Sequence, residues 1–99
     1  MSVNLSRQSV VVAAKDQVSC DLEGEAAILS LAKGTYYGLD LIGTQVWILL
    51  QQPRSVAEIC DAILQEYEVD PECCYKDLLA LLERLRTEGL IEVRVGPTV

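Results

Sequence analysis

The side chains that could carry out acid–base, nucleophilic or metal chemistry are restricted by one absence: the 99-residue sequence contains no histidine. Histidine is the usual general base near neutral pH and the usual partner of a serine or cysteine nucleophile. The four cysteines, Cys20, Cys60, Cys73 and Cys74, include no C-x-x-C pair and have no histidine with which to complete a mixed zinc site. We therefore expect reduced thiols, no metal, no cofactor and no enzyme activity, and the adjacency of Cys73 and Cys74 leaves a redox role open.

The acidic side chains that stand close together along the chain have structural explanations. Glu23 and Glu25 flank a glycine in a predicted turn, and Asp70 and Glu72 begin a predicted helix, where acids stabilise the helix dipole. No glycine spacing in the sequence matches a phosphate-binding loop. Recognition is therefore a better-supported class of function than catalysis.

The charge of the chain narrows the partners that it can recognise. Fifteen acidic and eight basic side chains give a net charge of −7, and the part from Arg54 onward carries ten acids against five bases. This surface repels phosphate, whereas nucleic-acid binding depends on neutralising it, so a neutral or basic peptide or protein is the favoured partner. No secretory signal or apolar run of membrane-spanning length is present, which predicts a single cytoplasmic domain over residues 1–99 with an ordered core at about 9–95.

The first half of the chain has the residue pattern of a small antiparallel sheet. Strands are predicted at 9–13, 26–32 and 35–39, with 18–22 as a candidate continuation of the first strand after a polar break. Residues 23–25 are predicted to form a turn, and Lys33-Gly34 a tight connection. A three-stranded sheet leaves an edge with unpaired amides and carbonyls, to which an extended peptide can add itself as a further strand.

The second half of the chain carries clear helix start and stop signals. Asp40 can cap a first helix, Ser55 and Glu58 form a capping box for a second, and Asp70 precedes a first-turn proline in a third that ends at Gly89. The predicted helices, closing strand and tail are 41–51, 55–67, 71–88, 90–95 and 96–99. The third helix has more apolar surface than one packing face requires, and this surplus either faces a partner or is covered by the rest of the domain.

The junction between the two halves carries a resemblance to a known family. Tyr36-Tyr37-Gly38-Leu39-Asp40, followed by Gly43 and Trp47, leads from the third predicted strand into the first helix. Together with the 55–67 helix and the closing Leu85-x-x-x-Gly89-Leu90-Ile91, this run resembles the PqqD-like precursor-recognition proteins of ribosomally made, modified peptides, and most closely the stand-alone members in lasso-peptide clusters. The resemblance extends from about Val10 to Val95. The family usually has Asn at the position of Asp40, and both residues cap helices.

The resemblance implies a non-catalytic α+β module with a winged helix-turn-helix-like arrangement, in which a three-stranded antiparallel N-terminal sheet is followed by three helices. Such modules bind the leader segment of a precursor peptide and deliver it to a separate cysteine-protease-like leader peptidase, and an ATP-dependent cyclase then closes the ring. In the family the leader pairs with the third strand, here 33–39, and rests against the third helix, here 71–88.

The site residues that follow from this resemblance come from the sheet and from the third helix. The sheet contributes residues for backbone pairing and local pockets: Leu29, Leu31, Lys33, Thr35, Tyr36, Tyr37 and Gly38. The helix contributes residues beside the main core stripe: Cys73, Lys76, Asp77, Ala80, Leu81 and Arg84. The alternative for each tyrosine is an aromatic residue of the sheet core, and the alternative for the charged helix residues is an ordinary solvated face.

Two further functions compete with leader-peptide recognition. One is a structural subunit that docks on a larger enzyme without touching the peptide. The other is a winged-helix nucleic-acid binder, which needs a basic third helix; Lys76, Arg84 and Arg86 are outnumbered there by four acids. The charge argues against nucleic acid, whereas the structural role is compatible with peptide recognition.

Overall fold

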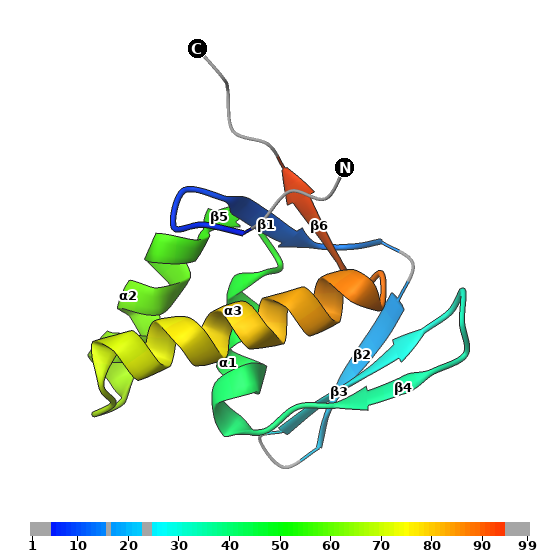
Figure 1. Ribbon diagram of the computed structural model, residues 1–99. Coiled ribbons are helices and arrows are strands. Elements are labelled where there is room, and N and C mark those ends of the chain that lie inside the picture. Colours follow the sequence, from blue (N-terminus) through cyan, green and yellow to red (C-terminus); the bar gives the residue numbers. More distant parts are fainter. Residues whose placement is uncertain (1–4, 16, 23–24, 95–99) are drawn as a thin grey trace.

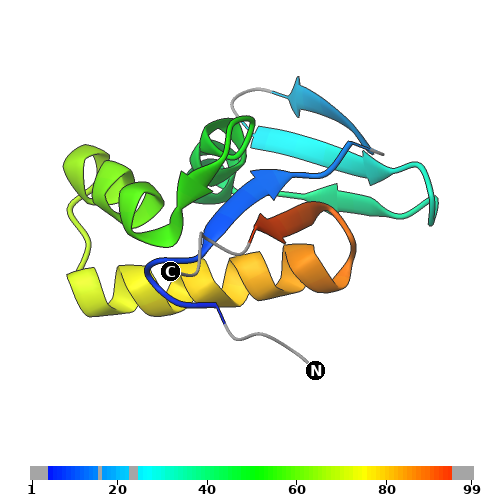
Figure 2. The ribbon, with the colours of Figure 1, turned by 90° about the horizontal axis from the view of Figure 1, so that it is seen from above.

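The computed structural model describes residues 5–15, 17–22 and 25–94, and the predicted tail at 96–99 lies outside them. Figure 1 shows the longest helix crossing the front of the molecule, and Figure 2 shows that two small sheets and the other two helices all lie on one side of it. In chain order the elements are β1 (Val10–Ala13), β2 (Gln17–Leu22), β3 (Glu25–Ser30), β4 (Tyr36–Gly38), α1 (Leu41–Leu49), β5 (Arg54–Ser55), α2 (Val56–Glu66), α3 (Pro71–Thr87) and β6 (Ile91–Arg94).

The fold class predicted from the sequence is confirmed: three antiparallel strands, β2, β3 and β4, are followed by three helices. The assignment of the first strand requires a correction. Residues 17–22 form a strand of their own beside β3, whereas β1 leaves this sheet and pairs with β5 and β6 in a second one, ordered β5-β1-β6. The reason is that the closing strand needs a partner for its backbone groups, and β1 supplies them in register from Val10 opposite Arg94 to Ala13 opposite Ile91.

The helix boundaries follow the capping residues of the sequence. The Asp40 carboxylate accepts a hydrogen bond from the Gly43 amide at 2.7 Å, and the Ser55 and Glu58 side chains bond each other's backbone amides at 3.1 and 2.9 Å. Asp70 caps α3 through the Cys73 amide at 3.1 Å. Ordered local signals of this kind specify where a helix starts, because each satisfies a backbone donor that the helix itself leaves free.

The helix ends differ slightly from expectation. α1 ends at Leu49 rather than 51, and Leu50 is its C-cap. α3 ends at Thr87, with Glu88 as C-cap and Gly89 at φ 77°, a left-handed conformation that glycine adopts without a Cβ clash. The two-residue strand β5 was not predicted.

The core lies where the three helices meet the inner faces of both sheets. Ile28 of β3 and Val11 of β1 are fully buried, so both sheets contribute to it. Thr44 of α1 accepts a hydrogen bond from the Ala26 amide at 2.7 Å in this interior, which fixes α1 against the β2–β4 sheet. The helices bury an apolar stripe each: Val46, Trp47 and Leu50; Val56, Ile59, Cys60 and Ile63; and Leu78, Leu82 and Leu85.

Candidate functional site

β4 is an edge strand whose outer side is unpaired within the described part of the chain. On its inner side, Thr35 accepts a backbone hydrogen bond from Ser30 and Leu39 donates one to Ala26, both at 2.9 Å. Backbone groups of successive residues in an antiparallel strand point to opposite sides. The N–H and C=O groups of Tyr36 and Gly38 are therefore directed away from β3, so that they can pair with one more strand.

A groove of about 570 Å³ lies beside this edge, between α1 and α3. Its walls include apolar side chains from both helices and from α2, and its rim carries four charged residues. The lining residues are Asp40, Ile42, Gly43, Val46, Ile63, Val69, Asp70, Cys73, Cys74, Asp77, Leu78, Ala80, Leu81 and Arg84. The groove therefore combines an apolar floor with polar positions at its margin, which is the composition typical of ligand sites.

A glycine in the first turn of α1 allows the end of β4 to pack closely against this helix. A Cβ added to Gly43 would lie 3.1 Å from the Asp40 carboxylate and 3.3 Å from the Leu39 Cβ. Both contacts are tighter than a side chain normally makes, so glycine allows the capping carboxylate and the strand to approach the helix closely. The chain consequently passes directly from β4 into α1, as Figures 1 and 2 show, and Asp40 and Gly43 at this turn line the groove.

Two side-chain contacts join the β4 hairpin to α3. Arg84 Nε donates to the Tyr37 hydroxyl at 3.0 Å, and its guanidinium carbon lies 5.3 Å from the centre of the Tyr37 ring. Lys33 Nζ approaches the Thr87 carbonyl oxygen at 3.4 Å. Both contacts connect β4 and its preceding turn to α3. A second hollow, smaller than the groove, is lined by Tyr37, Glu83, Arg84, Thr87 and Glu88.

The cysteines of α3 have different surroundings. Cys73 is exposed, and its thiol faces the Asp70 carboxylate, which raises the pKa of the thiol. Cys74 is buried with its Sγ 3.8 Å from Cys60 Sγ, and burial raises the pKa of the Cys74 thiol to about 11. Both effects keep the thiols protonated at neutral pH, whereas nucleophilic cysteines need the thiolate.

The predicted helix residues are largely brought together. Cys73, Asp77, Ala80, Leu81 and Arg84 all line the groove, and Ala80 and Leu81 provide the surplus apolar surface expected of the third helix. Lys76 is exposed on α3 and is not among the groove-lining residues.

The predicted sheet residues divide between four positions. Tyr36 and Gly38 present the free edge, and Tyr37 and Lys33 reach α3. The Thr35 side chain is exposed, and its backbone carbonyl pairs with Ser30 of β3. Leu29 stands opposite both Val18 and Tyr36, and these three exposed side chains share the face of the sheet that points away from the core, with Leu31 two residues further along.

Several lining residues are not among those that the sequence indicates for the site. Asp40 is predicted only to cap a helix, and Ile42, Val46, Ile63 and Val69 lie outside the predicted site. Ile42 and Val69 are each 36% exposed, although both are large and apolar. The signal that the sequence offers is Ile42, a large apolar residue next to the capping residue at the start of a helix. It could not be assigned to a site without knowing that α1 faces α3.

The described residues contain no group of three or more acidic, cysteine or histidine side chains placed to hold a metal ion. None of the helices in the same part of the chain has the length and apolarity needed to cross a bilayer. The site offers backbone donors and acceptors, an apolar floor and charges at the rim. Its chemistry is that of reversible binding.

The fold and the site together define a winged helix-turn-helix-like α+β domain with an open strand edge beside a helix-lined groove. The model of the family described as Coenzyme PQQ synthesis protein D (PqqD) matches residues 25–91. The chain belongs to the PqqD family, as its resemblance predicted. A search of curated protein sequences found no match.

Two solved structures are similar to the whole domain. The structure titled "TbiB1 in Complex with the TbiA(beta) Leader Peptide" is 35% identical with a TM-score of 0.76, and the alignment covers 89% of this chain and 99% of that one. The structure titled "Lasso peptide synthetase B1 complexed with the leader peptide" is 20% identical with a TM-score of 0.73, covering 83% and 96%. The second similarity concerns the fold alone.

Proposed function

We propose that this protein binds the leader segment of a ribosomally made precursor peptide, of the lasso-peptide class, in the cytoplasm. The leader adds as a strand to the outer edge of β4 and rests against α3. The observation that carries the proposal is the position of the groove: the unpaired edge at Tyr36 and Gly38 opens beside a 570 Å³ apolar groove. The solved relative at 35% identity, which is titled as a leader-peptide complex, supports the same ligand class.

The two parts of the site have different tasks. Backbone pairing along β4 provides affinity that does not depend on the leader's side chains, because amides and carbonyls are common to all peptides. Pockets beside the strand provide selectivity, because alternate side chains of an added strand point into them. The apolar surface for these side chains is formed by Ala80 and Leu81 on α3 and by Ile42 and Val46 across the groove.

The protein would then present the bound precursor to a separate, cysteine-protease-like leader peptidase, before an ATP-dependent cyclase closes the ring. Its own contribution is to hold the leader in an extended conformation, which reduces the entropic cost of ordering the precursor when the peptidase binds it. Leader cleavage by the peptidase should accelerate when this protein is added. Equal cleavage rates with and without it would contradict presentation but leave leader binding intact.

The direct test is a titration of the purified protein with a labelled leader peptide from its own gene neighbourhood, alongside a duplex DNA control. Micromolar or tighter binding to the leader alone, weakened by substitution of Tyr36 or Tyr37 in a folded variant, is the expected result. A folded protein that does not bind the leader would favour the alternative of a structural subunit. Binding to the duplex would revive the nucleic-acid alternative, which the net charge of −7 disfavours.

A further inference from the structure

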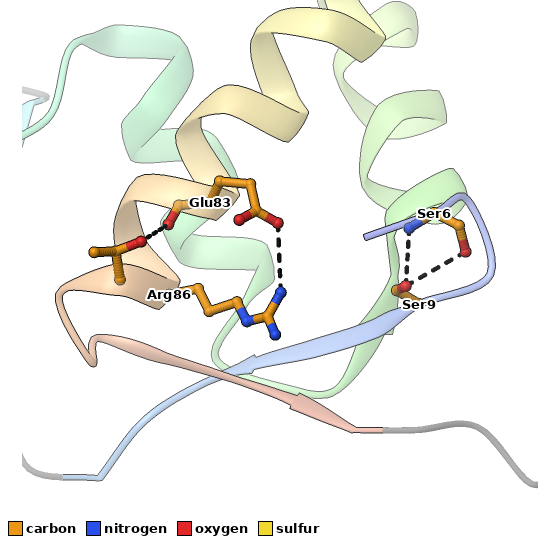
Figure 3. A network of polar contacts seen from close by, with 5 residues as sticks. Ser6, Ser9, Glu83 and Arg86 are labelled. Carbon is orange, nitrogen blue, oxygen red and sulfur yellow. Dashed lines mark hydrogen bonds and ion pairs between the residues drawn. The ribbon is translucent and has the colours of Figure 1, made fainter. Parts of the chain in front are cut away.

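The charged residues of α3 fall into two groups with different partners. On one side, Arg86 Nη1 lies 3.5 Å from Glu83 Oε1, as Figure 3 shows beside the Ser6–Ser9 turn. On the groove side, Asp77 has no hydrogen bond or ion pair to another described residue, and Arg84 contacts the neutral Tyr37 rather than a carboxylate. The groove therefore has two opposite charges that are not neutralised within the described part of the chain.

The two charges lie at different points along the groove. Asp77 and Arg84 are seven positions apart on α3, which is two helical turns, so both can face the same side. At 1.5 Å per residue their Cα atoms are separated by about 10 Å. Asp40 and Asp70 also line the groove, but each carboxylate caps a helix N-terminus, whereas Arg84 is the basic lining residue.

The direction of β4 relative to α3 can be read from the contacts between them. Lys33, before the strand, reaches Thr87 near the end of α3, and Tyr37 reaches Arg84, one turn earlier. Asp40, after the strand, lines the groove together with both Asp77 and Arg84. β4 thus runs opposite to α3. A peptide that pairs antiparallel with β4, like the other strands of this sheet, runs in the same direction as α3 and passes Asp77 before Arg84.

We infer that the Asp77–Arg84 pair makes the groove read the charge order of the leader: a basic residue first, at Asp77, and an acidic residue after it, at Arg84. An extended strand rises about 3.3 Å per residue, and its side chains alternate between faces, so the two leader residues are roughly two or four positions apart. The inference rests on the proposed function and adds to it a sequence requirement and a direction.

Arg84 is already oriented for this role. Its Nε is used by the Tyr37 hydroxyl, and the ring lies alongside the guanidinium. A guanidinium has further N–H donors on its two terminal nitrogens, and these can bind a carboxylate without breaking the contact with Tyr37. Tyr37 is therefore a positioning residue, which holds the arginine at the groove margin.

The reverse orientation of the same peptide is disfavoured by the same pair. It would bring the acidic leader residue to Asp77 and the basic one to Arg84, so that two attractions become two repulsions. A sheet edge alone discriminates weakly between the two directions of an added strand, because its backbone groups can form hydrogen bonds with a strand in either direction. The charge pair therefore provides selectivity that backbone pairing lacks.

The test compares the labelled leader with a variant in which one basic and one acidic residue at this spacing are exchanged, so that composition and net charge stay the same. The wild-type protein should bind the exchanged leader about tenfold more weakly, and the difference should shrink in high salt. The double variant Asp77→Arg/Arg84→Asp should reverse this preference. The matched control, Glu66→Arg/Arg94→Asp, reverses one acid and one base that are exposed outside the groove and should keep the wild-type preference.

The outcomes separate this inference from the proposed function. Failure of the native leader to bind the wild-type protein would overturn both. Tight binding of the native leader with equal affinity for the exchanged leader would overturn the charge-order inference and leave leader recognition standing. The comparison of the two peptides on the wild-type protein needs no variant, so it decides the question even if the double variant does not fold.

Discussion

Replacement of Tyr36 by proline tests the central geometric statement about β4, that the Tyr36 amide points away from the sheet. The substitution removes one outward N–H, and no hydrogen bond to β3 is lost with it. Proline is tolerated on edge strands where the missing donor faces outward. The domain should therefore remain folded while its free edge loses a donor.

The magnitude follows from the number of backbone groups on that edge. Tyr36 and Gly38 each offer one N–H and one C=O, which allows up to four hydrogen bonds to a leader strand. At about 1 kcal/mol net for each, edge pairing contributes about 4 kcal/mol. Proline removes one bond and leaves a leader carbonyl unpaired, which together cost about 1–3 kcal/mol, so the dissociation constant should rise by about 5- to 150-fold.

The assay is a fluorescence-anisotropy titration of the labelled leader, with circular dichroism to verify folding. The structure offers a matched control at the opposite edge of the same sheet. The backbone groups of Ile28 and Ser30 in β3 face β4, so those of Ala27 and Leu29 face β2. The backbone amide of Ser19 in β2, which stands opposite Ile28, therefore points away from β3. Ser19→Pro should leave leader affinity unchanged. Tyr36→Ala keeps the amide and reports the side chain alone. Wild-type affinity in a folded Tyr36→Pro variant would refute strand addition at β4, as would an equal loss in Ser19→Pro.

Three further predictions concern stability, thiol reactivity and the Tyr37 contact. Ser55→Ala removes the hydroxyl that accepts from the Glu58 amide in the capping box of α2 and should lower the free energy of unfolding by about 1 kcal/mol in urea titrations at neutral pH. The Ser55 amide and hydroxyl both lower the pKa of Glu58, so this carboxylate stabilises the fold above its unfolded pKa and ceases to do so as the pH falls through its folded value. Alanine keeps the amide, so only the hydroxyl's share of this stabilisation is missing in Ser55→Ala; the deficit should narrow in acid by that share, and a constant deficit would contradict this account. A thiol reagent followed by mass spectrometry should label exposed Cys20 and Cys73 in the folded protein and buried Cys60 and Cys74 only after unfolding, and rapid labelling of Cys74 would show that α2 and α3 separate readily. Tyr37→Phe removes the hydroxyl that Arg84 contacts and should weaken the preference for the native charge order more than it weakens total leader affinity, a difference visible in paired titrations with both peptides.

Local signals made the helix boundaries predictable. Asp40, Ser55 with Glu58, and Asp70 each act within three or four residues, so their effect can be read from a short stretch of sequence. The partner of β1 was not predictable in this way. Its residues pair with β6, about eighty positions later, and a strand pattern specifies the faces of a strand but not its neighbour.

The candidate site was also predictable only in part. The strand edge and the groove-facing residues of α3 followed from the family resemblance, and Asp77, Leu81 and Arg84 line the groove. The opposite wall was missed because Ile42 and Val69 acquire their role only when α1 and the start of α3 come together. A residue whose function depends on an element distant in sequence leaves little local pattern.

The pairing of β1 with β6 has a consequence for how the domain could be joined to other proteins. Val10 and Arg94 are direct neighbours across that ladder, so the first and last strands of the described fold lie side by side. No groove-lining residue comes from β1, β5 or β6. The first and last strands of the described fold therefore lie together in a sheet that contributes nothing to the groove, so a fusion partner joined beside this sheet should leave the binding edge accessible.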